Sequence, residues 1–305
     1  MKFGLNHPYD PHEAPRLRLA PFVMRDEFDV PTMVDYITSV PGPWPMYLND
    51  QKGDCGPAAC GHAITATQWW GQGQVVRVTD DDVEKTYEDV GGYNPDDPST
   101  DNGVVLQDLL DYWRREGIGD HRILAFASVD IMSPTEMMYA LNTFGHLLIG
   151  MAVPASAEQQ FAHNQIWDTV STDGGIVGGH AVNVGFMDMV TGKREFVTWG
   201  SVASMTRNFW ERYGWEAWVV IDDAWVNIHS GQSPTGLNTA GLNDAFTKLT
   251  GQPGPFPSGP ASDVDADLAM AFMKDNWVLR RHYGDTHRVA ERGLAWLQAN
   301  GYTGK

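Results

Sequence analysis

Three things are scarce in this chain of 305 residues: cysteine, basic side chains and long apolar segments. Its two cysteines are Cys55 and Cys60. If they lie on one helix, five residues apart, their Cα atoms stand roughly 7 Å or more apart, beyond disulfide reach. Two thiols are also too few for a structural zinc site of the usual kind. We therefore expect no disulfide, and at least one thiol is left for chemistry or for simple burial.

The shortage of basic residues excludes whole classes of partner. Lys and Arg number 21 against 39 Asp and Glu, which gives a net charge of −18. This charge argues against nucleic acid and anionic membrane as partners, and we interpret it as a source of solubility. No apolar run is long enough to cross a bilayer, and the first residues lack the apolar segment of a secretory signal. We expect a cytoplasmic or virion-associated protein.

Motifs for cofactors are missing as well. The sequence contains neither a phosphate-binding loop nor a dinucleotide fingerprint. The acidic runs 80–82 and 96–97 suggest calcium only loosely and fit solvated loop carboxylates better. We expect no cofactor and no bound metal.

The first half of the chain is predicted to be mainly helical. A helix should run from Gly56 or Pro57 to about residue 70, because small and apolar residues recur there at spacings of three and four. An acidic helix is expected over 78–90, and another, capped by Asp101 or Asn102, should end at Gly117. Ser-Pro-Thr-Glu at 133–136 predicts a capped helix that ends near Phe144.

Strands should dominate the stretch 147–222. Residues 147–153 are continuously apolar, and an alternating pattern begins near residue 176. A turn over 188–193 and a return strand complete a predicted hairpin, and 216–222 is a further strand. Helices before an antiparallel sheet predict an α+β fold.

Composition divides the chain into four parts. We expect an extended, proline-rich lead-in over 1–45, a main domain over 46–230, a linker over 231–261 with one short helix near 240–249, and a C-terminal helical segment over 262–305. The apolar positions of that last segment fit docking onto the main domain, onto another copy of the chain or into an assembly.

One cysteine stands in a setting that suits chemistry. The sequence Gly53-Asp54-Cys55-Gly56-Pro57 places a thiol at the start of the first helix, after a polar loop. Backbone N–H groups and the helix dipole favour a thiolate there, and the same N–H groups can stabilise an oxyanion. A buried, inert cysteine is the alternative.

A thiol nucleophile needs a base that is close in space, whatever its distance in sequence. His180 is the best candidate because it opens a strand behind Gly178 and Gly179, which allow another chain to approach closely. His62 lies about 10 Å along the helix from Cys55 and is predicted to be a packing residue.

These motifs resemble those of papain-like cysteine peptidases. Residues 54–58, Asp-Cys-Gly-Pro-Ala, are similar to the pattern of the bacteriocin-processing C39 branch. The His180 strand and the later Thr198-Trp199-Gly200 resemble the histidine strand and the Trp-Gly stretch of the superfamily. The resemblance covers about 46–221 and extends to uncharacterised proteins of actinobacteria and their phages. It implies a papain-like fold, with Cys55 on an N-terminal helix and His180 on a C-terminal antiparallel sheet. The helical segment predicted over 262–305 is appended to this fold.

Two positions depart from the resemblance. The oxyanion glutamine is expected six residues before the cysteine, where this chain has Asn49, while Gln51 lies four before it. The residue before Thr198 should be Asn or Asp to orient the imidazole, and it is Val197. Thr198 can replace it if the hairpin contains a bulge, as can Asp188 or a backbone carbonyl. Trp199 is expected to shield His180 from water.

Three functions are compatible with this sequence. The first is a cysteine peptidase or amidase that cleaves a peptide or peptidoglycan substrate through a Cys55–His180 dyad and a thioester. The second is a papain-fold structural or binding protein without turnover, for example in a virion, which Val197 favours. The third is acyl transfer by the same dyad, with an amine in place of water.

Overall fold

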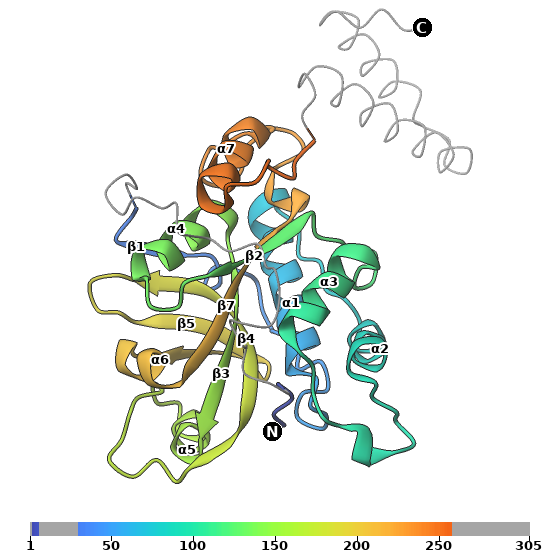
Figure 1. Ribbon diagram of the computed structural model, residues 1–305, viewed down its shortest axis with the longest axis vertical. Helices are drawn as coiled ribbons and strands as arrows, with labels where there is room; N and C mark the ends of the chain where they lie inside the picture. The colour runs from blue at the N-terminus through green and yellow to red at the C-terminus, as the bar shows by residue number, and fades with distance from the viewer. Residues whose placement is uncertain (1, 6–29, 258–305) are drawn as a thin grey trace, which may run out of the picture. The chain divides into compact units, whose positions relative to one another are not determined.

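The computed structural model describes residues 2–5 and 30–257, and the described residues up to Phe256 belong to one compact unit (Figure 1). The C-terminal helices predicted for 262–305 and most of the predicted lead-in lie outside the described residues. The helices are α1 (Cys55–Thr67), α2 (Asp80–Gly91), α3 (Leu106–Arg115), α4 (Pro134–Phe144), α5 (Ala155–Ala162), α6 (Arg207–Tyr213) and α7 (Thr239–Thr250). The strands are β1 (Met33–Asp35), β2 (Ala125–Val129), β3 (Leu147–Pro154), β4 (Ile176–Asp188), β5 (Arg194–Thr198), β6 (Ser201–Met205) and β7 (Gly214–Ile221).

Helix boundaries follow local capping chemistry. The Thr79 hydroxyl accepts from the N–H of Asp82 at the start of α2, and the Asp82 carboxylate accepts from the N–H of Thr79. These two bonds form a full capping box. The Ser133 hydroxyl accepts from the N–H of Glu136 at the start of α4, but the Glu136 carboxylate accepts from Asp130 N–H. The box predicted at 133–136 is therefore only half formed.

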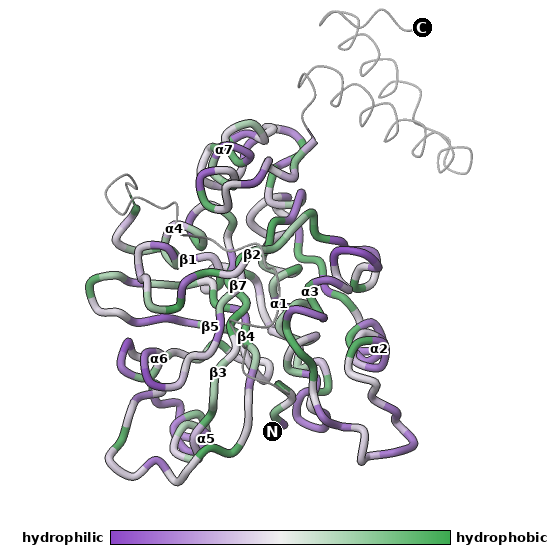
Figure 2. The backbone as a smooth tube through the Cα atoms, viewed as in Figure 1, coloured by the Kyte–Doolittle hydropathy of each residue, from purple (hydrophilic) through white to green (hydrophobic). Residues whose placement is uncertain are grey.

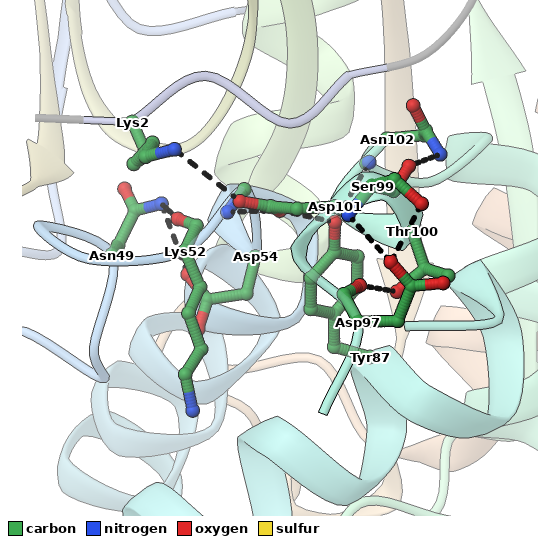
Figure 3. Close-up of polar contacts among 12 residues, drawn as sticks. Lys2, Asn49, Lys52, Asp54, Tyr87, Asp97, Ser99, Thr100, Asp101 and Asn102 are labelled. Carbon is green, nitrogen blue, oxygen red and sulfur yellow. Dashed lines mark hydrogen bonds and ion pairs between the residues drawn. The ribbon is translucent and has the colours of Figure 1, made fainter. Parts of the chain in front are cut away.

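The start of α3 differs from the prediction. Neither Asp101 nor Asn102 caps it, because the helix begins at Leu106 behind an extended Val105. Asp101 accepts hydrogen bonds from a tyrosine and from a distant backbone N–H (Figure 3). A capping residue and a buried acceptor look alike in sequence, because both are short acidic side chains before an apolar run.

Antiparallel pairing joins seven strands into one sheet. The order is β2-β7-β3-β4-β5-β6, and β1 pairs with the far end of β4. The turn predicted over 188–193 is present: Asp188 N–H donates to the Lys193 carbonyl, and Gly192 N–H to the Asp188 carbonyl. Helices first and an antiparallel sheet afterwards confirm the predicted α+β class.

The sheet separates two apolar cores. Along β7, Ala217 and Val219 lie in the core shared with α4, α6 and α7, whereas Trp218 and Val220 face α1, α2 and α3. Figure 1 shows α1, α2 and α3 together on one side of the strands, and Figure 2 shows apolar colour along much of β3 and a largely hydrophilic α2. Residue alternation on each strand therefore decides which core a side chain joins.

Two segments that lie outside the predicted main domain 46–230 contribute to the core beside α4. β1, inside the predicted lead-in, pairs with β4 through Val34. α7, inside the predicted linker, buries Leu242, Phe246 and Leu249 in the first core. Within the described ranges, no helix has the length and apolarity needed to cross a membrane.

Candidate active site

Cys55 is the first residue of α1 and is almost fully buried, with 1% of its surface exposed. The loop before it contains Gly53, where a side chain would collide with the Asp101 carboxylate 2.7 Å from its Cβ. The small Gly56, Pro57 and Ala58 that come next let the helix begin at once. Burial raises the pKa of the Cys55 thiol to about 12.

A hydrogen bond joins Cys55 to the histidine strand. The N–H of Ala181 on β4 donates to Cys55 Sγ at 3.3 Å, across 126 residues of sequence. His180 is therefore the immediate neighbour of a residue that touches the thiol. It is completely buried, and burial lowers its pKa to about 3. With these pKa values, the buried thiol and the buried imidazole are both neutral near pH 7.

A threonine contacts the ring of His180. The Nε2 atom of His180 lies 2.7 Å from the Thr198 hydroxyl at the end of β5. Val197 pairs with Asn183 on β4, and Val184 pairs with Phe196. Directly paired residues point to the same face of a sheet, so Val197 shares a face with Asn183, and Thr198 shares one with Val182 and His180.

A bulge in β4 sets this register. Pairing shifts between Val184 and Phe186, so that Gly185 is the extra residue. If Gly185 were instead paired regularly with Phe196, Val184 would oppose Val197, and the valine would share the face of His180. The bulge therefore exchanges Val197 for Thr198 beside the imidazole. A side chain at Gly185 would lie 2.4 Å from Ile37, which explains why the extra residue is glycine.

Trp199 stacks on His180, with ring centroids 4.5 Å apart and an interplanar angle of 19°. It belongs with Gly200 to a two-residue turn between β5 and β6, and both residues have positive φ, 45° and 70°. Such a turn has the geometry favoured in tight hairpins. Trp199 is 4% exposed, and it covers one face of the imidazole.

The two candidate oxyanion amides are placed differently. Asn49 is buried, and its Nδ2 donates to Asp54 Oδ1 at 3.0 Å and to the Lys52 carbonyl at 3.2 Å. Gln51 is exposed, with its amide 3.5 Å from Asp50. Asn49 is thus held beside the residue that precedes Cys55, whereas Gln51 points to solvent. Burial raises the pKa of Asp54 to about 8.

Asp101 organises the loop before Cys55, a role that the sequence did not indicate (Figure 3). Its Oδ1 accepts from Gly53 N–H at 2.8 Å and from the Tyr87 hydroxyl at 2.7 Å. Its Oδ2 lies 3.5 Å from Lys2 Nζ. This carboxylate therefore joins α2, the nucleophile loop and the first residues of the chain.

Residues 2–5 lie directly over the candidate dyad, and we call them the covering segment. Lys2 N–H donates to the Asn49 carbonyl at 3.2 Å, Leu5 N–H to the Gly179 carbonyl at 3.1 Å, and Val104 N–H to the Gly4 carbonyl at 2.7 Å. The Phe3 ring stands edge-on to His180, 5.7 Å between centroids. The segment that approaches Gly178 and Gly179 closely belongs to this same chain: Cβ atoms at these positions would lie 2.5 Å from Phe3 and 2.6 Å from the Leu5 carbonyl.

His62 is a packing residue, as expected. It is buried on α1, its Nε2 lies 2.9 Å from the Pro45 carbonyl, and the rings of Trp44 and Tyr47 surround it. In the described ranges, no group of three or more His, Cys, Asp or Glu residues is arranged to hold a metal ion.

Comparison with solved structures identifies the architecture. Xylellain, a cysteine protease from Xylella fastidiosa, superposes with a TM-score of 0.53 at 14% identity, over 73% of this chain and 98% of that one. This chain has a papain-like fold. Procathepsin B S9 from Trypanosoma congolense matches with a TM-score of 0.51 at 14% identity, over 72% of this chain and 87% of that one.

The papain-like fold is supported by structural comparison and not by sequence comparison. No protein-family model matches the chain, and no curated protein matches it significantly. The predicted papain-like arrangement is confirmed, with Cys55 on an early helix and His180 on the later antiparallel sheet.

Proposed function

We propose that this chain is a cysteine hydrolase that cleaves a peptide or amide bond. The observation that carries the proposal is the contact between the two motifs: Cys55 at the start of α1 accepts a hydrogen bond from the residue next to His180. A papain-like fold gives this juxtaposition a known chemical use, although a fold alone does not guarantee an activity.

The chemistry is dictated by the groups present. His180 takes the proton of the Cys55 thiol, and the thiolate attacks the substrate carbonyl carbon to form a tetrahedral oxyanion. The imidazolium then protonates the leaving amine as the C–N bond breaks, which leaves a thioester. Water, deprotonated by His180, attacks the thioester and releases the acid and the thiol.

Three further residues support this reaction in the proposal. Thr198 accepts from the imidazolium Nε2–H and fixes the orientation of the ring. Trp199 excludes water from the same ring. The backbone N–H of Cys55 and the Asn49 amide supply the oxyanion site once Asn49 exchanges its bond to Asp54 for the substrate. Gln51, being exposed, is the second choice.

Val197 supports the competing function, a papain-like protein without turnover. It is buried and cannot accept a hydrogen bond, and it occupies the position where the resemblance predicts Asn or Asp. The finer assignment to a C39-like peptidase rests on residues 54–58. A bond in peptidoglycan or in a precursor protein is the substrate that we propose with it.

Labelling by iodoacetamide across pH tests the dyad. Once residues 2–5 are displaced and Cys55 is accessible, a thiolate–imidazolium pair makes this thiol react faster at neutral pH than an ordinary thiol, and His180→Ala should remove that advantage. Cys55→Ala identifies the labelled residue, and Cys60, fully buried on the same helix, reports unfolding. If Cys55 is accessible and is labelled at the same rate in wild type and His180→Ala, the result favours the papain-like protein without turnover.

A further inference from the structure

One arginine is buried without a counter-charge. Arg194, the first residue of β5, is 1% exposed, and its Nε has no hydrogen-bond partner. Its Nη1 donates to the Gly192 carbonyl at 3.1 Å, and its Cζ lies 5.7 Å from the centre of the buried Trp210 ring. Among the described residues, no carboxylate forms an ion pair with it. Charged side chains are almost never buried to this degree unless they are paired, so half of an ion pair is in place here.

A second arginine is held on the same turn. Arg207, the first residue of α6, is exposed, and its Nη2 donates to the Met189 carbonyl at 3.1 Å. Its Nε would lie 2.6 Å from a Cβ at Gly192, so this side chain rests directly on the glycine whose carbonyl Arg194 uses. The turn between β4 and β5 therefore anchors two guanidinium groups through its carbonyls, one of them buried and the other at the surface.

The charges around this pair do not balance. Burial and the neighbouring Arg207 lower the pKa of Arg194 to about 10, so its guanidinium remains charged at neutral pH. Glu195 pairs with the lysine before Arg194, and Asp188 accepts hydrogen bonds from its own turn. Glu211 on α6 attracts Arg194 through space, but this carboxylate is exposed and no ion pair joins the two. Two cations and one carboxylate leave one positive charge without a partner.

We infer that Arg194 and Arg207 form a binding site for a carboxylate of an acidic peptide segment supplied by another molecule. A guanidinium presents its N–H groups in a planar fork that matches the two oxygens of a carboxylate, and such charge-assisted bonds are stronger than neutral ones. A single carboxylate balances the charge, whereas a phosphate dianion would place excess negative charge beside Glu211. No residue of the candidate active site takes part, so the inference is independent of the hydrolase proposal.

The surface around the two arginines suits a peptide rather than a small anion. Val190 follows the residue whose carbonyl holds Arg207, and its side chain is 78% exposed. Met33 on β1 pairs with Asp188 at the start of the same turn and is 57% exposed. Exposed apolar side chains beside a charged anchor are typical of protein interaction sites. We therefore expect the partner to carry an apolar residue next to its acidic one.

The first test is a titration of the isotopically labelled full chain with two blocked peptides, acetyl-Leu-Glu-Leu-amide and acetyl-Leu-Gln-Leu-amide. NMR detects the Nε–H groups of arginine, and the Arg194→Lys chain identifies the Arg194 signal because it lacks that group. The glutamate peptide should shift this signal in a saturable way. The glutamine peptide has the same shape without the charge and should leave the signal in place.

Variants then assign the binding to the pair. Arg207→Gln should weaken binding of the glutamate peptide by about tenfold or more, because it removes one charge-assisted hydrogen-bonding group. Arg207 is exposed, so this change is compatible with folding. Arg114→Gln on α3 is the matched control: Arg114 is exposed and lies 3.1 Å from Asp111, and its loss should leave the affinity unchanged. The glutamate peptide should also raise the urea midpoint of wild type and of Arg114→Gln but not of Arg207→Gln, because a ligand that binds only the folded state stabilises it.

The outcomes are distinct. Saturable shifts of the Arg194 signal that Arg207→Gln weakens would support the site. The same response to both peptides, the same affinity in wild type and Arg207→Gln, or no response at all would overturn it. A shift caused by inorganic phosphate but not by the glutamate peptide, at equal ionic strength, would refute the assignment to a carboxylate. None of these measurements involves Cys55, so their failure does not bear on the hydrolase proposal.

Discussion

From the bulge at Gly185 we predict that Thr198, and not Val197, supports His180. The family resemblance alone would predict the opposite. Thr198→Val removes the hydroxyl 2.7 Å from His180 Nε2 while keeping the shape of the side chain. Val197→Asn restores the residue type that the resemblance predicts at that position. The register places position 197 on the face of Asn183, away from His180. We expect the first change to weaken the dyad and the second to leave it no stronger.

The magnitude is set by the burial of the imidazole. A buried donor left without its acceptor costs about 1–3 kcal/mol. Because the imidazolium form needs that acceptor, the cost falls on the thiolate–imidazolium state, and the labelling rate at neutral pH should drop roughly 5- to 150-fold. Val197→Asn instead buries an amide in a tight site and should lower the free energy of unfolding by about 1–3 kcal/mol.

The assay is iodoacetamide labelling of Cys55 from about pH 5 to about pH 9, which spans the ordinary pKa values of histidine and cysteine. Both variants are made in a chain that also carries Gly4→Ala, because a Cβ at position 4 would lie 1.5 Å from the Gly53 carbonyl oxygen and so displaces residues 2–5 from the thiol. Urea unfolding measures their stability. Thr198→Ser, which retains the hydroxyl, is the matched control. If Thr198→Val labels like its parent and Val197→Asn labels faster, the register argument is refuted.

Two further predictions concern stability. Burial raises the pKa of Asp54 to about 8, so the folded state holds a proton that the unfolded state releases near pH 3.8. Binding of this proton stabilises the folded state. That contribution to the free energy of unfolding is complete at low pH and is lost as pH rises through about 8. Asp54→Asn keeps an acceptor for Asn49. Its free energy of unfolding in urea should therefore match that of wild type near pH 4 and exceed it near pH 9. The same pH dependence in both proteins would contradict this reasoning. Phe246→Ala on α7 should cost about 3–5 kcal/mol of unfolding free energy, since the ring is buried in the main core; an unchanged single transition would show that α7 is peripheral.

Much of the fold was accessible from the sequence because its signals are local. The apolar run 147–153, the turn at 188–193 and the proline–glycine limits of 134–144 each depend on neighbouring residues, and each is found as β3, the β4–β5 turn and α4. The short elements α5 and β6 were missed, because eight or fewer residues of mixed polarity give too little periodicity to recognise.

The same distinction between local and long-range signals applies to the candidate site. The motifs around Cys55 and His180 are continuous stretches, so they could be recognised in the sequence. The tasks of Asp101 and of residues 2–5 could not, because each depends on partners more than forty residues away and on backbone atoms that no side-chain pattern records. The choice between Val197 and Thr198 was left open for a similar reason, since a bulge is a property of pairing.

The bulge also changes how chains of this architecture should be aligned. Gly185 lies between His180 and the Trp199-Gly200 turn, and whether it pairs with β5 or bulges out decides whether position 197 or 198 meets the imidazole. Counting Gly185 as a paired position assigns the partner of the imidazole to 197, whereas counting it as an unpaired bulge assigns the partner to 198. The pairing state of one glycine thus acts as a selector of side-chain identity: if Gly185 were drawn into regular pairing with β5, a methyl group would replace a hydroxyl beside the base without any substitution at position 197 or 198.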